Sequence, residues 1–248
     1  MKVLKRILIV LFVLIVVSGV GLGLYGYTLY EDKIKDQPIA DKVSDIKNDY
    51  YFVSLDEVPK DYLNAIIAVE DHRFKEHGAI DIIGIARAVV TNITSGELQE
   101  GGSTITQQVA KNLYFLEEDN VVRRKIAEMF MAIELENKYS KDEILELYIN
   151  TIYFGDGYYG IKQACKGYLN KEPIDMNLSE STMMAGIPNA PSAYAPTVNV
   201  TLCIERQNKV ISSMVENGYL TQEQANSIDQ SFIQEIYDSK KNSNDSNN

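Results

Sequence analysis

The amino-acid sequence predicts an all-α fold, preceded by one N-terminal transmembrane helix. Apolar residues recur mostly at helical spacing, strand-like alternation is short and rare, and one long run near the N-terminus carries no charge. The length of 248 residues fits one domain with a small appendage. The formal net charge of −11 disfavours nucleic acid as a partner. Two cysteines, Cys165 and Cys203, are too few for a disulfide framework, and we expect both to be free thiols.

The uncharged run covers Ile7 to Tyr30. As a helix it would be roughly 36 Å long at about 1.5 Å per residue, which exceeds a hydrocarbon core of about 30 Å. Basic residues precede it, so residues 1–6 are expected in the cytoplasm and the remainder outside the plasma membrane. A cleaved signal peptide is the alternative, but the run is longer than usual for one and no A-x-A-like site follows. The sequence therefore predicts a single-pass anchor at 7–30.

Three further segments follow the anchor. Residues 31–52 are charged and weakly patterned, as expected of a stalk. Residues 53–236 form the predicted domain, in which Ser140 with Glu143 and Thr221 with Gln224 make capping boxes that begin helices. Residues 237–248, rich in Lys, Asn, Ser and Asp, are expected to be disordered.

The first candidate cluster runs from Glu70 to Gly78, at the end of a helix that Pro59 is placed to begin. Glu70 shares a helical face with apolar residues, and an apolar setting suits a carboxylate for general acid or base catalysis. The alternative is an ordinary solvated helix end. A metal site is not favoured, because the two histidines lie five positions apart rather than four; its candidate ligands would be Asp71, His72, His77 and Asp81.

The second cluster runs from Gly101 to Asn112. Two glycines lead into Ser103, a plausible N-cap, so the amides of the following helix could bind an anion. Neutral polar side chains share one stripe of that helix, which indicates a groove wall. The alternative is a capped surface helix. The stripe consists of Thr104, Gln107, Gln108 and Lys111.

The third cluster places Arg124 and Glu128 at i,i+4 spacing on one helix. A carboxylate flanked by basic residues suits an anionic, metal-assisted leaving group, and a surface ion pair is the alternative. The opposite face is expected to be buried and consists of Ile126, Met129, Phe130 and Ile133.

Taken together, the three clusters resemble the peptidoglycan glycosyltransferases, glycosyltransferase family 51. The matching motifs are E-D-x-x-F-x-x-H-G from Glu70, G-x-S-T-I-T-Q-Q from Gly101, K-N at Lys111 and R-K-x-x-E from Arg124. The signature continues in K-x-x-I-L-E-x-Y-I-N from Lys141, and the resemblance covers roughly Val53 to Met214.

The resemblance implies a lysozyme-like helical head with a smaller, membrane-associated jaw. The apolar segment Ala79 to Ile93 fits the jaw, with a plain core helix as the alternative. The family polymerises lipid II into β-1,4 glycan, with inversion at the donor anomeric carbon and release of undecaprenyl pyrophosphate. Glu70 is implied as the base, and Glu128 as a second catalytic residue that orients the site or holds a divalent cation, Mg or Mn; no organic cofactor is implied. The substrate-binding residues implied are Asp71, Phe74, His77, Gly102, Ser103, Thr104, Gln107, Gln108, Lys111, Asn112, Arg124 and Lys125.

The sequence departs from the family pattern at two places. His77 is followed directly by Gly78, where many relatives have one more residue, which affects a loop. Asn120 stands where many members carry an Arg, and Arg123 is the candidate substitute. No K-T-G accompanies the S-x-x-K match at Ser44, so we expect glycan polymerisation without peptide cross-linking. The implied partners are lipid II, the growing lipid-linked glycan, the membrane and wall-synthesis proteins such as transpeptidases. A glycan-cleaving lytic transglycosylase or lysozyme-type enzyme, and an inactive cell-wall scaffold, are the alternative functions.

Overall fold

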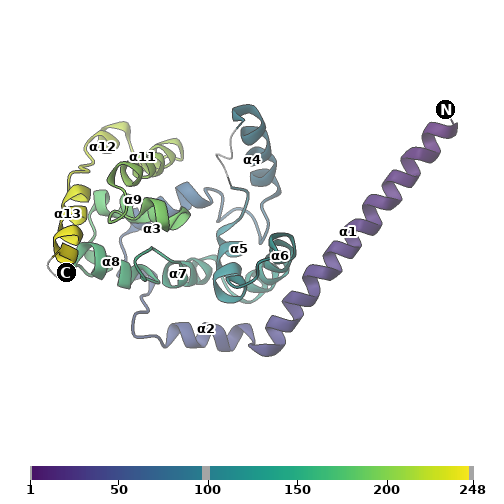
Figure 1. Cartoon of the computed structure of the whole chain (residues 1–248), viewed down its shortest axis with the longest axis horizontal. Helices are drawn as coiled ribbons and strands as arrows, with labels where there is room; N and C mark the ends of the chain where they lie inside the picture. The colour runs from purple at the N-terminus through teal and green to yellow at the C-terminus, as the bar shows by residue number, and fades with distance from the viewer. Residues whose placement is uncertain (1, 97–100, 246–248) are drawn as a thin grey trace.

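The computed structural model describes residues 2–96 and 101–245, and among these it contains helices and no strand. The all-α prediction is confirmed (Figure 1). An isolated antiparallel bridge joins Tyr153 to Tyr159. The α-helices are α1 Lys2–Asp36, α2 Ile39–Lys47, α3 Lys60–Glu70, α4 Ile82–Ser95, α5 Ile105–Ala110, α6 Val121–Lys138, α7 Lys141–Thr151, α8 Ile161–Leu169, α9 Leu178–Gly186, α10 Pro191–Tyr194, α11 Val200–Glu216, α12 Gln222–Asn226 and α13 Phe232–Asp245.

The head is built around α3, α9 and α11, which all pack against one another, while α5 packs on α6 and α7. Ser140 and Thr221 cap α7 and α12 in the predicted capping boxes. Both cysteines are free, as expected, and the structure places both in the interior. Burial raises the pKa of the Cys203 thiol to about 12, so this thiol stays protonated near neutral pH.

Helix α1 is long and apolar enough to cross a membrane, and it rises away from the body (Figure 1). Its last turns, however, dock on α6 of the domain. Gly26 allows this approach, because a Cβ there would lie 2.4 Å from Ile126 Cγ2. The rings of Tyr27 and Phe130 meet edge to face with centroids 5.3 Å apart. The apolar stretch that remains free of the domain therefore ends near Leu24, earlier than the predicted boundary at Tyr30.

The segment predicted as a stalk is part of the folded domain. Ile39 and Val43 of α2 are 1% and 4% exposed and belong to the hydrophobic core. The Tyr114 hydroxyl donates a hydrogen bond of 3.0 Å to the Gln37 carbonyl. Two apolar residues four positions apart were enough to give a short, mostly charged helix a buried face.

Helix α6 buries a different face from the one predicted. Its core face carries Ala127, Met131 and Leu135, each 0% exposed, together with Glu128. The predicted apolar face contacts α1 instead at Ile126 and Phe130. The correction has a physical cause, because α1 supplies an apolar partner for one face while ion pairs allow the other to bury a carboxylate.

Helix α4 carries the predicted jaw segment and projects beyond the body on the side toward which α1 rises (Figure 1). Its apolar side chains are exposed, which contradicts the alternative of a core helix. At its base, the Arg73 guanidinium makes hydrogen bonds of 3.1 and 2.9 Å to the two carboxylate oxygens of Asp81. The exposed apolar residues of α4 are Ile82, Ile83, Ile85, Val89, Val90 and Ile93.

The C-terminal segment is helical up to Asp245, so the predicted disorder of 237–248 is wrong for 237–245; residues 246–248 lie outside the described part. Ile233, near the start of α13, is fully buried in the core. This contact explains why a polar sequence continues as a helix, since tertiary packing supplies most helix stability.

Candidate active site

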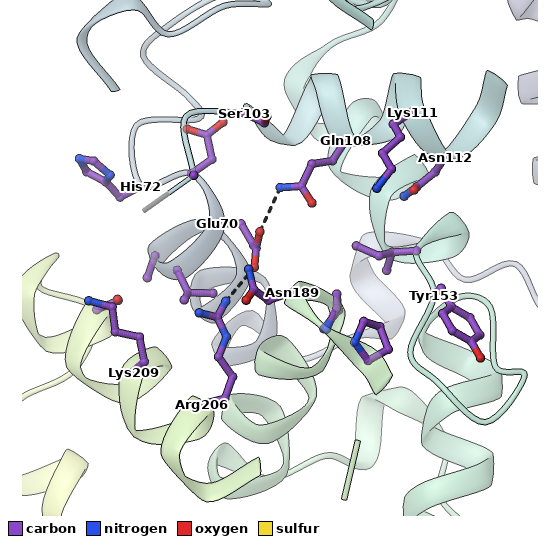
Figure 2. A pocket seen from close by; sticks show the side chains of 18 of the residues that line it. Glu70, His72, Ser103, Gln108, Lys111, Asn112, Tyr153, Asn189, Arg206 and Lys209 are labelled. Atoms are coloured by element: carbon purple, nitrogen blue, oxygen red, sulfur yellow. Dashed lines mark hydrogen bonds and ion pairs between the residues drawn. The ribbon is translucent and has the colours of Figure 1, made fainter. Parts of the chain in front are cut away.

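A cleft of about 640 Å³ opens at the end of α3, between the α4–α5 region and α11. Glu70 lies at its centre (Figure 2). Five basic side chains and three carboxylates line it, so the cleft is locally basic in an acidic chain. The basic residues are Arg87, Lys111, Lys125, Arg206 and Lys209, and the acidic ones are Glu70, Asp71 and Glu216.

Glu70 is held from two sides. Gln108 Nε2 donates a hydrogen bond of 3.0 Å to Oε2, and an Arg206 guanidinium nitrogen donates one of 3.0 Å to Oε1 (Figure 2). The Glu70 side chain is only 9% exposed. A carboxylate can accept about four hydrogen bonds, so two of these leave capacity for a substrate proton. The structure thus brings Glu70 and Gln108 together in the cleft.

Arg206 is a site residue that the sequence analysis missed. Its side chain is 13% exposed, and its Nε also donates to the Gly186 carbonyl at 3.2 Å. A signal was available in the sequence, because Arg206 lies three residues after Cys203 and four before Val210, on the buried face of α11. A basic residue on an apolar helical face usually has an acidic partner.

Two buried tyrosines lie near the site, and Tyr148 is close enough to Glu70 to be influenced by its charge. Tyr62 and Tyr148 are fully buried, and neither hydroxyl has a hydrogen-bond partner among the described residues. Burial, and then the charge of Glu70, raise the pKa of Tyr148 well above its ordinary value.

One wall of the cleft is cationic. Lys111 and Asn112 open a π-helical turn over Lys111–Phe115 that follows α5 directly. Such turns shift the helical register and are frequent at functional sites. Both residues line the cleft, and the Asn112 side-chain nitrogen is buried with no hydrogen-bond partner in the described part of the chain, as expected of a group that meets a ligand. Burial, and then Arg124, lower the pKa of Lys111.

Glu128 anchors this cationic wall from within. It is 0% exposed, its Oε2 lies 2.7 Å from Lys125 Nζ, and its Oε1 lies 3.4 Å from Arg124 Nε. Lys125 also donates a hydrogen bond of 3.0 Å to the Ser103 hydroxyl, and both residues line the cleft. The surface-pair alternative is therefore wrong for Glu128.

These surroundings do not fit a metal ion on Glu128. Two cations already neutralise the carboxylate, and Lys111 lies close enough for Glu128 to influence its pKa. A divalent cation would have to displace them. The oxygens and ring nitrogen of Asp71, His77 and Asp81 also lie near one another, but Arg73 holds Asp81 and the Ile105 amide donates to Asp71.

Several predicted contact residues have structural roles instead. Phe74 is fully buried, with Lys141 Nζ 4.5 Å from its ring centroid. His77 lies 2.7 Å from an Asp71 oxygen, and the other Asp71 oxygen accepts the Ile105 amide at 3.1 Å. Asp71 lines the cleft, whereas Phe74 and His77 do not.

The start of α5 differs from prediction in the same way. The N-cap is Thr104 rather than Ser103, and Thr104 and Gln107 form a buried capping box. Asp71 accepts a hydrogen bond from the Ile105 amide, and Thr104 accepts one from the Gln107 amide. Because these amides already have partners, the predicted anion site at this terminus is wrong. Gly102 packs against Ile85 of α4, while Ser103 faces the cleft.

The residues at the start of α6 point away from the cleft. Arg123 contacts the Tyr25 ring of α1, with its guanidinium carbon 4.9 Å from the ring centroid. Asn120 caps α6, and its side-chain amide donates to the Tyr25 hydroxyl at 3.4 Å. The predicted substitution of Arg123 for a phosphate-binding Arg is therefore not supported. Arg124 donates to the Glu118 carbonyl at 3.0 Å and acts through Glu128.

The opposite end of the cleft has a second group of basic residues. An Arg87 guanidinium nitrogen lies 2.7 Å from His72 Nε2, and because a guanidinium only donates, the imidazole accepts. Burial, and then Arg87, lower the pKa of His72. Lys209 completes this end (Figure 2).

Comparison with known proteins extends this description. The chain is 47% identical over 173 residues to penicillin-binding protein 1F of Bacillus subtilis, covering 70% of this chain and 24% of that protein. It is 44% identical over 186 residues to penicillin-binding protein 1A of Neisseria flavescens (75% and 23%), and 36% identical over 236 residues to that of Aquifex aeolicus (89% and 32%). A crystal structure of penicillin-binding protein 1A from Haemophilus influenzae matches with 23% identity and a TM-score of 0.43, covering 71% of this chain and 17% of that one.

The chain thus spans about a quarter to a third of the length of these curated relatives. The family model described as transglycosylase matches residues 36–215. This range begins in α1 and ends in α11, and it contains Glu70, Lys111, Glu128 and Arg206. The chain belongs to the transglycosylase family.

Proposed function

We propose that this chain is a peptidoglycan glycosyltransferase that polymerises lipid II into β-1,4 glycan and releases undecaprenyl pyrophosphate. The observation that carries the proposal is the pairing of a nearly buried carboxylate, Glu70, with a cationic wall at Lys111 and Lys125 in one cleft. Glycosyl transfer from a pyrophosphate needs both a base and a group that stabilises the departing anion.

In this mechanism Glu70 takes the proton of the attacking sugar hydroxyl. The oxygen forms a bond to the donor anomeric carbon from the face opposite the leaving group, so the configuration inverts. The bond to pyrophosphate breaks, and Lys111 and Lys125 stabilise the departing charge. Gln108 and Arg206 orient the carboxylate, and Asn112 supplies a buried amide for a substrate oxygen.

The same proposal places the chain at the outer face of the plasma membrane, with its N-terminus in the cytoplasm. Residues 7–24 would span about 27 Å as a helix at about 1.5 Å per residue, close to a hydrocarbon core of about 30 Å. The tyrosines that follow suit the interfacial region. The exposed apolar face of α4 would enter the same membrane, so the cleft opens where the lipid-linked substrate resides.

The alternatives differ in what the cleft must hold. A glycan-cleaving enzyme handles no pyrophosphate, and an inactive scaffold requires no oriented carboxylate, so the cationic wall and the Glu70 contacts both favour the transferase. No K-T-G occurs in these 248 residues, and we assign them no peptide cross-linking. Transpeptidases are accordingly proposed as partners.

The test is incubation of the detergent-solubilised chain with lipid II and, separately, with polymeric glycan. Wild type should polymerise lipid II, and Glu70→Gln should lose at least about 100-fold in rate, as expected when a general base is removed. Glu76→Gln, an exposed neighbour with the same charge change, serves as the control. Cleavage of polymer without polymerisation, or equal rates for wild type and Glu70→Gln, would overturn the proposal.

We further propose that side-chain cations, rather than a Mg or Mn ion on Glu128, neutralise the leaving group. The rate should then depend on Mg²⁺ concentration in the same way in wild type and in Glu128→Gln, whatever the drop in maximal rate. A change in the half-saturating Mg²⁺ concentration would restore Glu128 as a metal ligand.

A further inference from the structure

One end of the cleft is continuous with a group of exposed aromatic residues. Tyr153 lines the cleft at the end away from Lys209 (Figure 2). Its ring packs against that of Tyr159, with centroids 4.8 Å apart. Tyr159 in turn lines a second cavity of about 280 Å³, formed between α2, the segment after it, and the 150–163 region. This tilted pair of rings therefore connects the two cavities.

The second cavity adds further aromatic and polar groups. Tyr51 and Phe52 form part of its wall, together with Asp49 and Gln163. Tyr50, 83% exposed, meets Tyr51 edge to face at 5.1 Å. We call the surface formed by Tyr153, Tyr159, Tyr51 and Tyr50 the tyrosine track. All four residues are exposed, at 38%, 52%, 44% and 83%.

The loop that presents Tyr153 and Tyr159 is rigidly built. Its turn passes through Gly155, Asp156 and Gly157, which all have positive φ. Asp156 is held by the Thr197 hydroxyl at 3.0 Å and by Lys240 at 3.3 Å. The turn and these two contacts hold the loop in the conformation that exposes both rings. A preorganised aromatic side chain loses little entropy when it binds.

We infer that the tyrosine track is a second binding surface for the growing glycan strand, outside the catalytic cleft. This inference rests on the proposed function. The electron-rich face of an aromatic ring attracts the C–H face of a pyranose ring, and neighbouring Asp49 and Gln163 offer partners for hydroxyl and acetamido groups. The occupant is identified by continuity, because Tyr153 belongs both to the cleft in which the strand grows and to the track. Retention of the strand there favours repeated addition over release.

The experiment measures product length and first-coupling rate separately, using the full chain in detergent with lipid II. The first coupling yields a tetrasaccharide, which is too short to need the track. Tyr159→Ala and Tyr51→Ala should each leave the first-coupling rate within about twofold of wild type and shorten the mean glycan at least about twofold. Tyr159→Phe, which keeps the ring, should match wild type. Tyr219→Ala, at an exposed tyrosine between α11 and α12, is the control.

The outcomes are distinguishable. If wild type does not polymerise lipid II, the proposed function fails. If wild type polymerises and both alanine variants give wild-type lengths, the inference fails and the function stands. If the alanine variants slow the first coupling as much as they shorten the glycan, these residues act in the cleft or in folding, and the track is also refuted. Chitohexaose adds a direct probe, since it should bind Tyr159→Ala at least about threefold more weakly than wild type.

Discussion

Replacement of Glu128 by Gln tests the construction of the cationic wall. Glu128 is fully buried, 2.7 Å from Lys125 Nζ and 3.4 Å from Arg124 Nε. At an effective dielectric constant of about 20, the Lys125 and Arg124 contacts contribute roughly 6 and roughly 5 kcal/mol of Coulomb attraction, against a desolvation penalty of several kcal/mol per buried ion. The substitution leaves two cations beside Lys111 without their carboxylate.

The expected loss of stability is moderate. Breaking a fully buried pair costs about 3–5 kcal/mol, but the Lys125 side chain is 45% exposed and can turn toward water. We therefore expect Glu128→Gln to lower the free energy of unfolding by about 1–3 kcal/mol, which at this chain length lowers Tm by roughly 2–12 °C. Circular dichroism of the detergent-solubilised chain measures this directly.

Inorganic pyrophosphate provides the decisive arm of the experiment. An anion can replace the missing carboxylate, so pyrophosphate should stabilise Glu128→Gln more than wild type. The difference in the free energy of unfolding between the two proteins should then shrink by about 1 kcal/mol. Glu117→Gln, an exposed carboxylate just before α6, is the control and should behave as wild type. Equal Tm values for wild type and Glu128→Gln, with equal responses to pyrophosphate, would refute the assignment of Glu128 as the counter-ion of the wall.

Three further predictions concern other parts of the molecule. Arg206→Met should lower kcat of lipid II polymerisation at least about tenfold, because Glu70 loses the group that orients it; unchanged kcat would remove Arg206 from the site. Gly26→Leu should separate α1 from α6 and, by overpacking, lower the free energy of unfolding by about 1–3 kcal/mol, which a Tm equal to wild type would disprove. Two effects oppose each other at Asp81: burial raises its pKa, and the hydrogen bond from Arg73 lowers it. The net result is a pKa below the ordinary value. This ion pair is therefore fully stabilising above the ordinary value of 3.8 and is lost as the pH falls through the lower folded-state value. The destabilisation by Arg73→Met, measured by urea unfolding, should be constant from pH 5 to pH 7 and shrink toward pH 2, and a constant difference down to pH 2 would contradict it.

Local patterns predicted the helices well, because caps and periodicity act within a few residues. The capping boxes at Ser140 and Thr221 begin helices as expected. The site was harder to predict, because its contacts join distant parts of the chain. The partner of Glu70 on α11 is 136 positions away in sequence, and only the packing of α3 against α11 brings the two together.

Two errors share a cause in local geometry. The stripe drawn along α5 assumed a uniform helix, but the π-helical turn at Lys111–Phe115 changes the register beyond Ala110. Leu116, which directly follows this turn, lines the cleft. At the start of α5, the N-cap is Thr104 rather than Ser103. The Ser103 hydroxyl is therefore free to accept a hydrogen bond from the Lys125 ammonium. Helical spacing alone does not distinguish these cases.

Helix α6 explains how a strongly acidic chain can present a cationic wall beside its anchor. Its outer face packs on α1 through Ile126 and Phe130, and its inner face buries Glu128, which gathers Lys125 and Arg124. Because one rigid helix carries both faces, the position of the cationic wall is defined relative to the anchor. The 21 basic residues after Tyr30 are outnumbered by 35 acidic ones, so net charge alone would repel an anionic substrate. Local geometry decides otherwise, because a fully buried carboxylate holds two cations beside the cleft while most acidic residues elsewhere stay in water, where salt screens them.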